Sequence, residues 1–327
     1  MKRVLLIQMI LLLLVPGCRR GTDDGLTICF GFQDLETEFW VGAHKAITET
    51  LESRGIHVIE RNASQDANRQ LEQIRDAIAQ EVDGIIIIPQ DGQSANVIIA
   101  EANEAGIPIA VFNRPPSENS GNAIVVVADN QIIAEQAVDF MVGEAAKRDR
   151  KSRPCIIVGD LGDPNAVERK NGFYAALAKQ PNLFHAVVEV PSKWDANTTL
   201  ANFEAALQAN PDIDFVFASS DFLYPQIRAV LEPLDKWKPR GESKHVILGG
   251  LDGDQFACRM MRQGIVDATG VQDLFFEANA LLDELLNAID AGETRPKKRI
   301  KDPGFALTQS NFSAKHEDMW GCTLIDD

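Results

Sequence analysis

The sequence predicts an α/β protein built from two doubly wound parallel-sheet lobes. Apolar, strand-like runs alternate with helical segments of about 10–15 residues, the pattern of βαβ units in a parallel sheet. The alternation starts again after Asn130, and about ten strands would be many for a single sheet. The 327 residues are also enough for two domains that each bury a core.

Five strands and three helices are predicted before residue 130. The segment 39–51 has apolar residues at helical spacing, and Gly55 follows where a helix would stop. The four isoleucines between Gly84 and Pro89 form a continuous β-branched run, which is typical of a strand buried on both faces. The predicted strands are 26–32, 56–60, 84–89, 107–112 and 123–127, and the helices are 39–51, 71–78 and 93–105.

The same alternation is predicted from residue 130 to residue 290. The last helix, 273–290, has the strongest apolar periodicity in the chain. The predicted strands are 155–158, 185–190, 215–218, 246–248 and 265–271, and the helices are 130–148, 164–179, 196–209, 222–234, 254–262 and 273–290.

The first 25 residues are predicted to be a targeting segment. Lys2 and Arg3 precede an apolar run, 4–15, that is too short for a transmembrane helix of about 20 residues and suits a signal peptide. The residues before Cys18 resemble a bacterial lipobox, with Pro16 as an unusual member. We expect residues 1–17 to be a lipoprotein signal peptide, Cys18 to receive lipid and 18–25 to be a tether, with plain secretion as the alternative.

The balance of charge excludes one class of partner. Hydrophobic residues make up 45% of the chain and charged residues 24%, and the formal net charge is −16. Nucleic-acid binding needs a basic footprint, so no nucleic acid is expected as a partner.

Four cysteines follow Cys18 in the sequence. Cys29 and Cys155 lie in strand-like runs, where a cysteine acts as a small buried hydrophobe. Cys258 and Cys322 could pair in an oxidising compartment, but the sequence leaves both a disulfide and two free thiols open. No C-x-x-C motif or histidine cluster indicates a metal site.

Several spaced motifs resemble those of a known family. They are Asp83-Gly-Ile-Ile-Ile-Ile-Pro89, Gly106-Ile-Pro108, Asn113-Arg114, Asp129-Asn130, Glu168-Arg169-Lys170-Asn171-Gly172-Phe173, Leu251-Asp252-Gly253 and Gln272. Over residues 26 to 310 the chain resembles the ribose/galactose-type sugar-binding proteins of bacterial ABC transporters. The resemblance implies the type I periplasmic-binding fold, whose two lobes close over a ligand by hinge motion.

The resemblance also implies three crossovers between the lobes. We expect them near Asp129-Asn130, near Gln272 and around Lys301–Pro303, with Asp129, Asn130 and Gln272 as hinge residues. The N-terminal lobe would comprise 26–129 plus 273–302, and the C-terminal lobe 130–272 plus 303–327.

Polar residues at predicted strand ends are the first candidates for contacting a sugar. Arg114 and Arg169 are placed by their motifs to point into the cleft, where a guanidinium can grip two hydroxyls; the alternatives are a solvated turn residue and a surface charge. Asp252 would accept from hydroxyls, or instead cap the helix that starts at 254. Asn113 stands where the family usually has aspartate. Ser220 stands where the family often has asparagine.

Aromatic residues and Gln272 complete the candidate site. Trp40, Phe39 and Trp194 match positions where the family stacks aromatics on the sugar ring, although aromatics at helical spacing are often core residues. Gln272 would bond both the ligand and the hinge.

No catalytic motif, cofactor or metal site is predicted. The sequence has no G-x-S-x-G, Walker A or H-E-x-x-H motif, so we expect no enzyme. The signal peptide and the lipobox imply an exported, lipid-anchored protein, periplasmic or at the cell surface, which we expect to be a monomer. The family resemblance implies that it captures a monosaccharide or polyol and delivers it to an ABC permease with its ATPase. The alternative is a ligand-sensing input protein for a membrane kinase or chemoreceptor.

Overall fold

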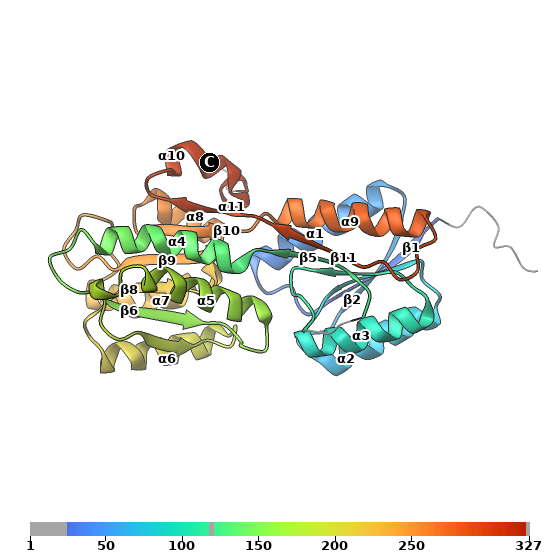
Figure 1. Cartoon of the computed structure of the whole chain (residues 1–327), viewed down its shortest axis with the longest axis horizontal. Coiled ribbons are helices and arrows are strands. Elements are labelled where there is room, and N and C mark those ends of the chain that lie inside the picture. The colour runs from blue at the N-terminus through green and yellow to red at the C-terminus, as the bar shows by residue number, and fades with distance from the viewer. Residues whose placement is uncertain (1–24, 118–120, 325–327) are drawn as a thin grey trace, which may run out of the picture.

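In the described residues, 25–117 and 121–324 of the computed structural model, two six-stranded sheets are each covered by helices (Figure 1). The strand orders are β11-β5-β4-β3-β1-β2 and β12-β10-β9-β8-β6-β7. The strands pair in parallel, except that β10 and β12 are antiparallel. The predicted fold class is confirmed.

The first lobe has α1 and α9 on one face of its sheet and α2 and α3 on the other (Figure 1). Its strands are β1 (Thr27–Phe32), β2 (His57–Asn62), β3 (Gly84–Ile88), β4 (Ile109–Phe112), β5 (Ile124–Ala128) and β11 (Lys298–Asp302). Its helices are α1 (Glu38–Ser53), α2 (Ala67–Ala79), α3 (Gly92–Ala105) and α9 (Leu274–Asp290).

The second lobe has α4 and α5 packed together on one face of its sheet and α6, α7 and α8 on the other. Its strands are β6 (Arg153–Val158), β7 (Val188–Pro191), β8 (Ile213–Ala218), β9 (Ile247–Asp252), β10 (Ala268–Val271) and β12 (Phe305–Thr308). Its helices are α4 (Asn130–Ala145), α5 (Pro164–Ala178), α6 (Ala196–Ala209), α7 (Tyr224–Leu231), α8 (Gln255–Arg262), α10 (Phe312–Lys315) and α11 (Trp320–Thr323).

The central strands are buried on both faces, as continuous apolar runs in a parallel sheet require. Every residue of β3 and of β5 is buried, so the prediction for the run that begins at Gly84 is confirmed. Because the helices fill both faces of each sheet, a ligand can approach only at a sheet edge or beyond the strand ends.

The chain passes between the two sheets three times. It leaves the first lobe between β5 and α4, returns between β10 and α9, and leaves again between β11 and β12. These passages fall at residues 129, 272–273 and 303–304. The two lobes, each with its own sheet, are therefore joined by three short connecting segments.

The sequence prediction missed β11 and β12. Lys298–Asp302 is a charged edge strand with one buried residue, so it lacks the apolar pattern of the inner strands. The helix expected at 222–234 was also wrong in extent. Pro225 and Pro233 divide it into two 3-10 turns that flank α7, because proline removes a backbone donor and clashes with the preceding turn.

A disulfide between Cys258 and Cys322 joins α8 to α11. The choice that the sequence left open is therefore decided by tertiary structure. Cys29 and Cys155 are free and buried, as predicted. Cys18, the predicted lipidation site, lies outside the described residues. Among the described residues, no helix combines the length and apolar character needed to cross a membrane.

Candidate functional site

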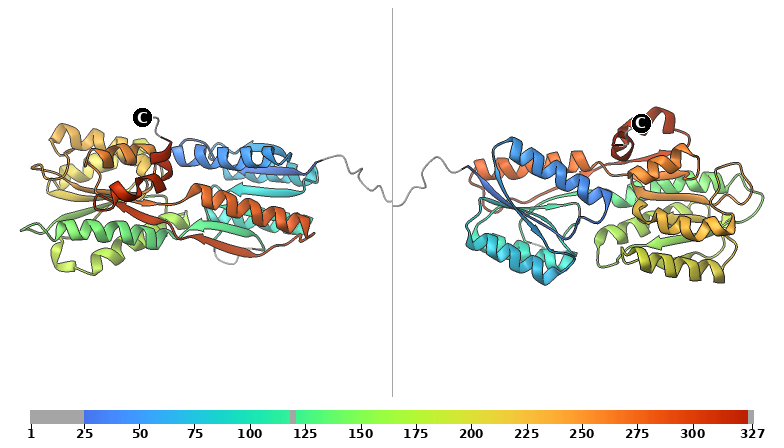
Figure 2. Two further views of the ribbon diagram at one scale, coloured as in Figure 1. Left: turned by 90° about the horizontal axis from the view of Figure 1, so that it is seen from above. Right: turned by 180° about the vertical axis from the view of Figure 1, so that it is seen from behind.

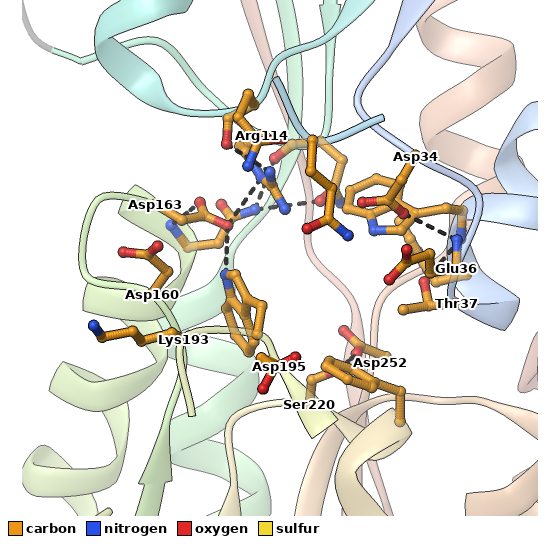
Figure 3. Close-up of a pocket in the computed structure, with 18 of the residues that line it drawn as sticks. Asp34, Glu36, Thr37, Arg114, Asp160, Asp163, Lys193, Asp195, Ser220 and Asp252 are labelled. Atoms are coloured by element: carbon orange, nitrogen blue, oxygen red, sulfur yellow. Dashed lines mark hydrogen bonds and ion pairs between the residues drawn. The ribbon is translucent and has the colours of Figure 1, made fainter. Parts of the chain in front are cut away.

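A cavity of about 580 Å³ lies between the lobes (Figure 3). It is placed beyond the carboxyl ends of strands from both sheets, the position where open α/β sheets bind ligands. All nine residues predicted to contact a ligand line this cavity. They are Phe39, Trp40, Asn113, Arg114, Arg169, Trp194, Ser220, Asp252 and Gln272.

Arg169 is buried in α5 and held by three partners. Its Nη1 forms an ion pair with Oδ1 of Asp252 at 2.9 Å and donates to the carbonyl oxygen of Ser219 at 2.7 Å. Its Nε donates to Oδ1 of Asn130 at 2.7 Å. The side chain is only 5% exposed, so the alternative of a surface charge is wrong.

Asp252 ends β9 with a backbone φ of 136°, which residues with a side chain rarely adopt. Its carboxylate accepts from Nε2 of Gln272 at 2.7 Å and from the hydroxyl of Ser220. Burial raises the pKa of Asp252, and the Arg169 charge opposes that rise. The helix-capping alternative is wrong for Asp252, because Asp254 is the residue that caps α8.

Arg114 follows β4 and reaches across the cleft. Its Nε lies 3.0 Å from Oδ2 of Asp163 at the start of α5, so this ion pair joins the two lobes. Its Nη1 donates to the carbonyl oxygens of Pro89 at 3.2 Å and Gln90 at 2.7 Å. Arg114 is 7% exposed, so the alternative of a solvated turn residue is wrong.

The amide of Asn113 is committed to neighbouring protein groups. Its Nδ2 donates to Oε1 of Gln272 and to Oε2 of Glu277, both at 2.9 Å, and its Oδ1 accepts from Asn165 at 3.2 Å. Burial raises the pKa of Glu277 well above the ordinary value for glutamate. An aspartate at 113 would place a second carboxyl against that of Glu277, whereas the Asn113 amide donates a hydrogen bond to it.

Each lobe contributes one arginine beside one tryptophan. In the first lobe, the Arg114 guanidinium carbon lies 5.5 Å from the Trp40 ring centroid. In the second lobe, that of Arg169 lies 5.8 Å from the Trp194 ring, a cation–π distance in both cases. The Trp194 indole N–H also donates to Oδ2 of Asp163 at 3.2 Å. The cavity therefore has a cationic donor and an aromatic ring on each side.

The segment before α1 supports the first-lobe aromatics. Thr37 caps α1 by accepting from the backbone N–H of Trp40. The side-chain amide of Gln33 is satisfied when its nitrogen donates to the carbonyl oxygen of Ile88 and its oxygen accepts from the Trp40 indole N–H at 3.1 Å. Phe39 is 5% exposed and packs on Trp320, so it is a core residue as well as part of the cavity wall.

Carboxylates outnumber cations at the rim of the cavity. Five carboxylate side chains lie there, and Figure 3 labels Asp34, Glu36, Asp160 and Asp195 among them, together with the cation Lys193. The five are Asp34, Glu36, Asp91, Asp160 and Asp195. Within the part of the chain that the structure describes, none of the five forms an ion pair, whereas both deep arginines are paired with acids. The lining therefore repels anions.

Three residues that organise the site were not predicted. Asp163, in a Gly-Asp-Pro turn, has the signature of a helix cap, and it does cap α5. Its second oxygen also holds Arg114 and Trp194, which the cap signal cannot reveal. Asn165 and Glu277 carry no motif at all, because their roles depend on contacts between distant segments.

The predicted hinge residues lie at two of the passages between lobes. At the first, Asn130 is buried and donates to Oδ1 of Asn165 at 3.0 Å. Asp129 donates its backbone N–H to the carbonyl of Asp302 at 2.8 Å and pairs with Lys301 at 3.1 Å. The first and third passages are thereby joined side by side.

Substituting Asp221 should change how stability depends on pH. Burial and the Asp252 charge raise the pKa of Asp221 from 3.8 to about 7. The folded state then holds more protons than the unfolded state between about pH 4 and 7, so this group lowers stability as pH rises through that window. We expect Asp221→Asn to gain stability relative to wild type at pH 8 more than at pH 5, measured by urea unfolding.

The exposed Asp290 offers a matched control for this measurement. Asp290→Asn should leave the difference between the two pH values unchanged. An Asp221→Asn protein with the same pH dependence as wild type would contradict the assignment to Asp221.

Comparisons with known proteins identify the family. The model of the periplasmic binding protein domain matches residues 28–294. The chain belongs to the periplasmic binding protein family. The binding protein is 27% identical to the ribose import binding protein of Bacillus subtilis over 252 residues, which cover 77% of this chain and 78% of that one. It is 26% identical to the galactofuranose-binding protein of Escherichia coli over 298 residues, which cover 86% of each.

Solved structures share the fold of the binding protein. A galactofuranose-binding protein superposes with a TM-score of 0.79 at 21% identity, covering 90% of this chain and 99% of that one. The Caulobacter myo-inositol-binding protein, solved with myo-inositol, has a TM-score of 0.79 at 19% identity, covering 91% of this chain and 98% of that one. These similarities confirm the type I periplasmic-binding fold.

Family membership settles three of the expectations from sequence. The resemblance to the ribose/galactose type is confirmed by these relatives, and the family is one of binding proteins rather than enzymes. Family membership also places the binding protein in the periplasm.

Among residues 25–117 and 121–324, no group of three or more His, Cys, Asp or Glu side chains could hold a metal ion.

Proposed function

We propose that the protein is a receptor that captures a monosaccharide or related polyol between its lobes and delivers it to an ABC permease. The observation that carries this proposal is the pair of arginine–tryptophan contacts, one on each side of the cavity. The names of the relatives, which include import proteins for ribose and D-apiose, support the same class of ligand.

The chemistry of the cavity suits a neutral, hydroxyl-rich ligand. The guanidinium groups of Arg114 and Arg169 donate in a fixed fork, and the Asp252 carboxylate accepts from hydroxyls. The faces of Trp40 and Trp194 suit the C–H patches of a sugar ring. In this proposal, Ser220 and Gln272 act on the ligand mainly by holding the Asp252 carboxylate, and Asn113 acts by holding Gln272.

We also propose the lobe boundaries and the hinge. The two sheets support an N-terminal lobe of 26–129 plus 273–302 and a C-terminal lobe of 130–272 plus 303–327. Asp129, Asn130 and Gln272 would absorb the backbone rotation that closes the cleft.

A thermal-shift screen of the mature protein tests the function. Pentoses, hexoses, inositols and furanosyl sugars should include a ligand that raises the melting temperature. At about 100 times its dissociation constant, a ligand adds about 2.7 kcal/mol of stability. Sugar phosphates and uronic acids should give no shift, because the rim carboxylates repel anions. If no neutral sugar or polyol shifts the transition, the proposal is wrong.

We further propose that lipid on Cys18 anchors the protein, with 18–25 as the tether. The signal-peptide pattern and the cysteine that follows it support this proposal. Cys18→Ser should move the protein from the membrane fraction to the soluble fraction of the cell envelope, as seen by immunoblot. An unmodified N-terminal cysteine in the mature wild-type protein, measured by mass spectrometry, would refute it.

A further inference from the structure

The C-terminal segment, Phe312–Leu324, covers the strand end that carries Asp252. It includes α10 and α11, and its α11 packs against α8. Both views in Figure 2 show it on the second lobe, close to where the lobes meet. The disulfide between Cys258 and Cys322 fastens the segment to α8 in this position.

The segment binds the backbone of the strand end directly. The indole N–H of Trp320 donates to the carbonyl oxygen of Asp252 at 2.9 Å, and this bond is buried. The next N–H, that of Gly321, donates to the carbonyl oxygen of Gly253 at 3.0 Å. A Cβ on Gly321 would lie 2.2 Å from the carbonyl carbon of Asp254, so only glycine permits this approach.

The strand end needs support, because its backbone conformation is unfavourable. Asp252 has a φ of 136°, and such strain persists only where the surroundings impose it. On one side, Oδ2 of Asp221 accepts the Gly253 N–H at 2.8 Å. On the other side, the C-terminal segment holds the two carbonyl oxygens. The Asp252 carboxylate, which faces the cavity, is oriented by the backbone held between them.

Trp320 also touches the first lobe. Its ring centroid lies 6.1 Å from that of Phe39, which lines the cavity, and both rings are nearly fully buried. Beside this contact, the N–H of Gln255 donates to Oε2 of Glu38 at 2.8 Å. One residue therefore contacts a cavity-lining residue in each lobe.

We propose that Trp320 is a positioning residue for ligand binding and that the disulfide-fastened C-terminal segment holds Asp252 in its ligand-binding orientation. This inference rests on the proposed function, because it concerns how tightly the same cavity holds its ligand. Trp320 acts through the Asp252 carbonyl and through Phe39, without lining the cavity itself.

Trp320→Phe tests the hydrogen bond while keeping an aromatic ring. We expect affinity to fall by up to about tenfold, because ligand binding must then impose the Asp252 orientation that a hydrogen bond of ordinary strength holds in the wild-type protein. Affinity is measured by calorimetry at 25 °C with D-ribose, D-galactose and myo-inositol as probes, after a melting curve has shown that each variant is folded at that temperature. A merely structural role would lower the melting temperature and leave the affinity of the folded protein unchanged. Trp237→Phe, the same change away from the cavity, should bind as wild type does.

Gly321→Ala tests the close backbone approach independently. The added methyl group would push the segment away from Gly253, so affinity should again fall tenfold or more with the disulfide intact. Gly143→Ala is the matched control, because a Cβ at Gly143 meets no atom within 4 Å. If both Trp320→Phe and Gly321→Ala bind with wild-type affinity, the inference about Trp320 is wrong and the proposed function still stands. A wild-type protein that binds no probe and gives no shift in the wider screen would overturn the proposed function as well.

Discussion

Arg169→Met is expected to abolish ligand binding and to destabilise the protein at the same time. The substitution removes a fixed donor fork from the cavity, and hydrogen bonds to charged groups contribute about 1.5–3 kcal/mol each. Two lost ligand contacts would weaken binding at least about a hundredfold. It also leaves Asp252 buried without its ion-pair partner, which typically costs about 3–5 kcal/mol of stability. Calorimetric titration and urea unfolding measure the two effects.

A second variant separates the two effects. In Arg169→Met/Asp252→Asn, the uncompensated charge is gone, so most of the lost stability should return while ligand binding stays absent. Arg228→Met, which removes an exposed arginine from an i,i+4 pair on α7, should change neither quantity. If Arg169→Met binds ligand normally, Arg169 is not part of the binding site.

Replacing both Cys258 and Cys322 by serine is expected to cause the second large effect. The disulfide closes a loop across a sequence separation of 64 residues. In the chain-entropy description, such a cross-link raises the free energy of unfolding by roughly 4 kcal/mol. We therefore expect the double variant to unfold at a markedly lower urea concentration than the oxidised wild-type protein.

Reduction of the wild-type protein provides the control. Wild type treated with dithiothreitol should unfold at the same urea concentration as the untreated double variant, and the double variant should not respond to the reductant. Equal stability of oxidised and reduced wild-type protein would contradict a stabilising role for the disulfide.

The elements that could be predicted from sequence are those whose signal is local. The run at Gly84–Ile88 is visible in the residue pattern because it is continuously apolar and buried on both faces. The helix at Leu274–Asp290 is visible because its apolar residues recur at helical spacing. The charged edge strand Lys298–Asp302 has no such signal, because its pairing with β5 alone makes it a strand. The family resemblance also indicated nine candidate residues, and all nine line one cavity.

The interior of the site was less predictable. Asn113 was seen as a departure from the family pattern, but its hydrogen bond to Glu277, which lies 164 residues further along the chain, could not be predicted. Similarly, Arg169 was expected to face a ligand, and the sequence could not show that it is already paired with Asp252. Such contacts depend on which side chains the fold brings together and on the burial that makes an unpaired charge costly.

The two-lobe α/β architecture could be predicted from the periodicity of the chain, and the family and nine residues of the cleft from the resemblance that its motifs carry. How those residues are held depends on contacts that form only in the folded chain. The tertiary structure joined Cys258 to Cys322, placed Asp163 against Arg114 across the lobes and set Trp320 against the carbonyl of Asp252. Hydrogen bonds and ion pairs depend on distances of a few ångströms between distant segments, and packing of the two lobes is what sets those distances.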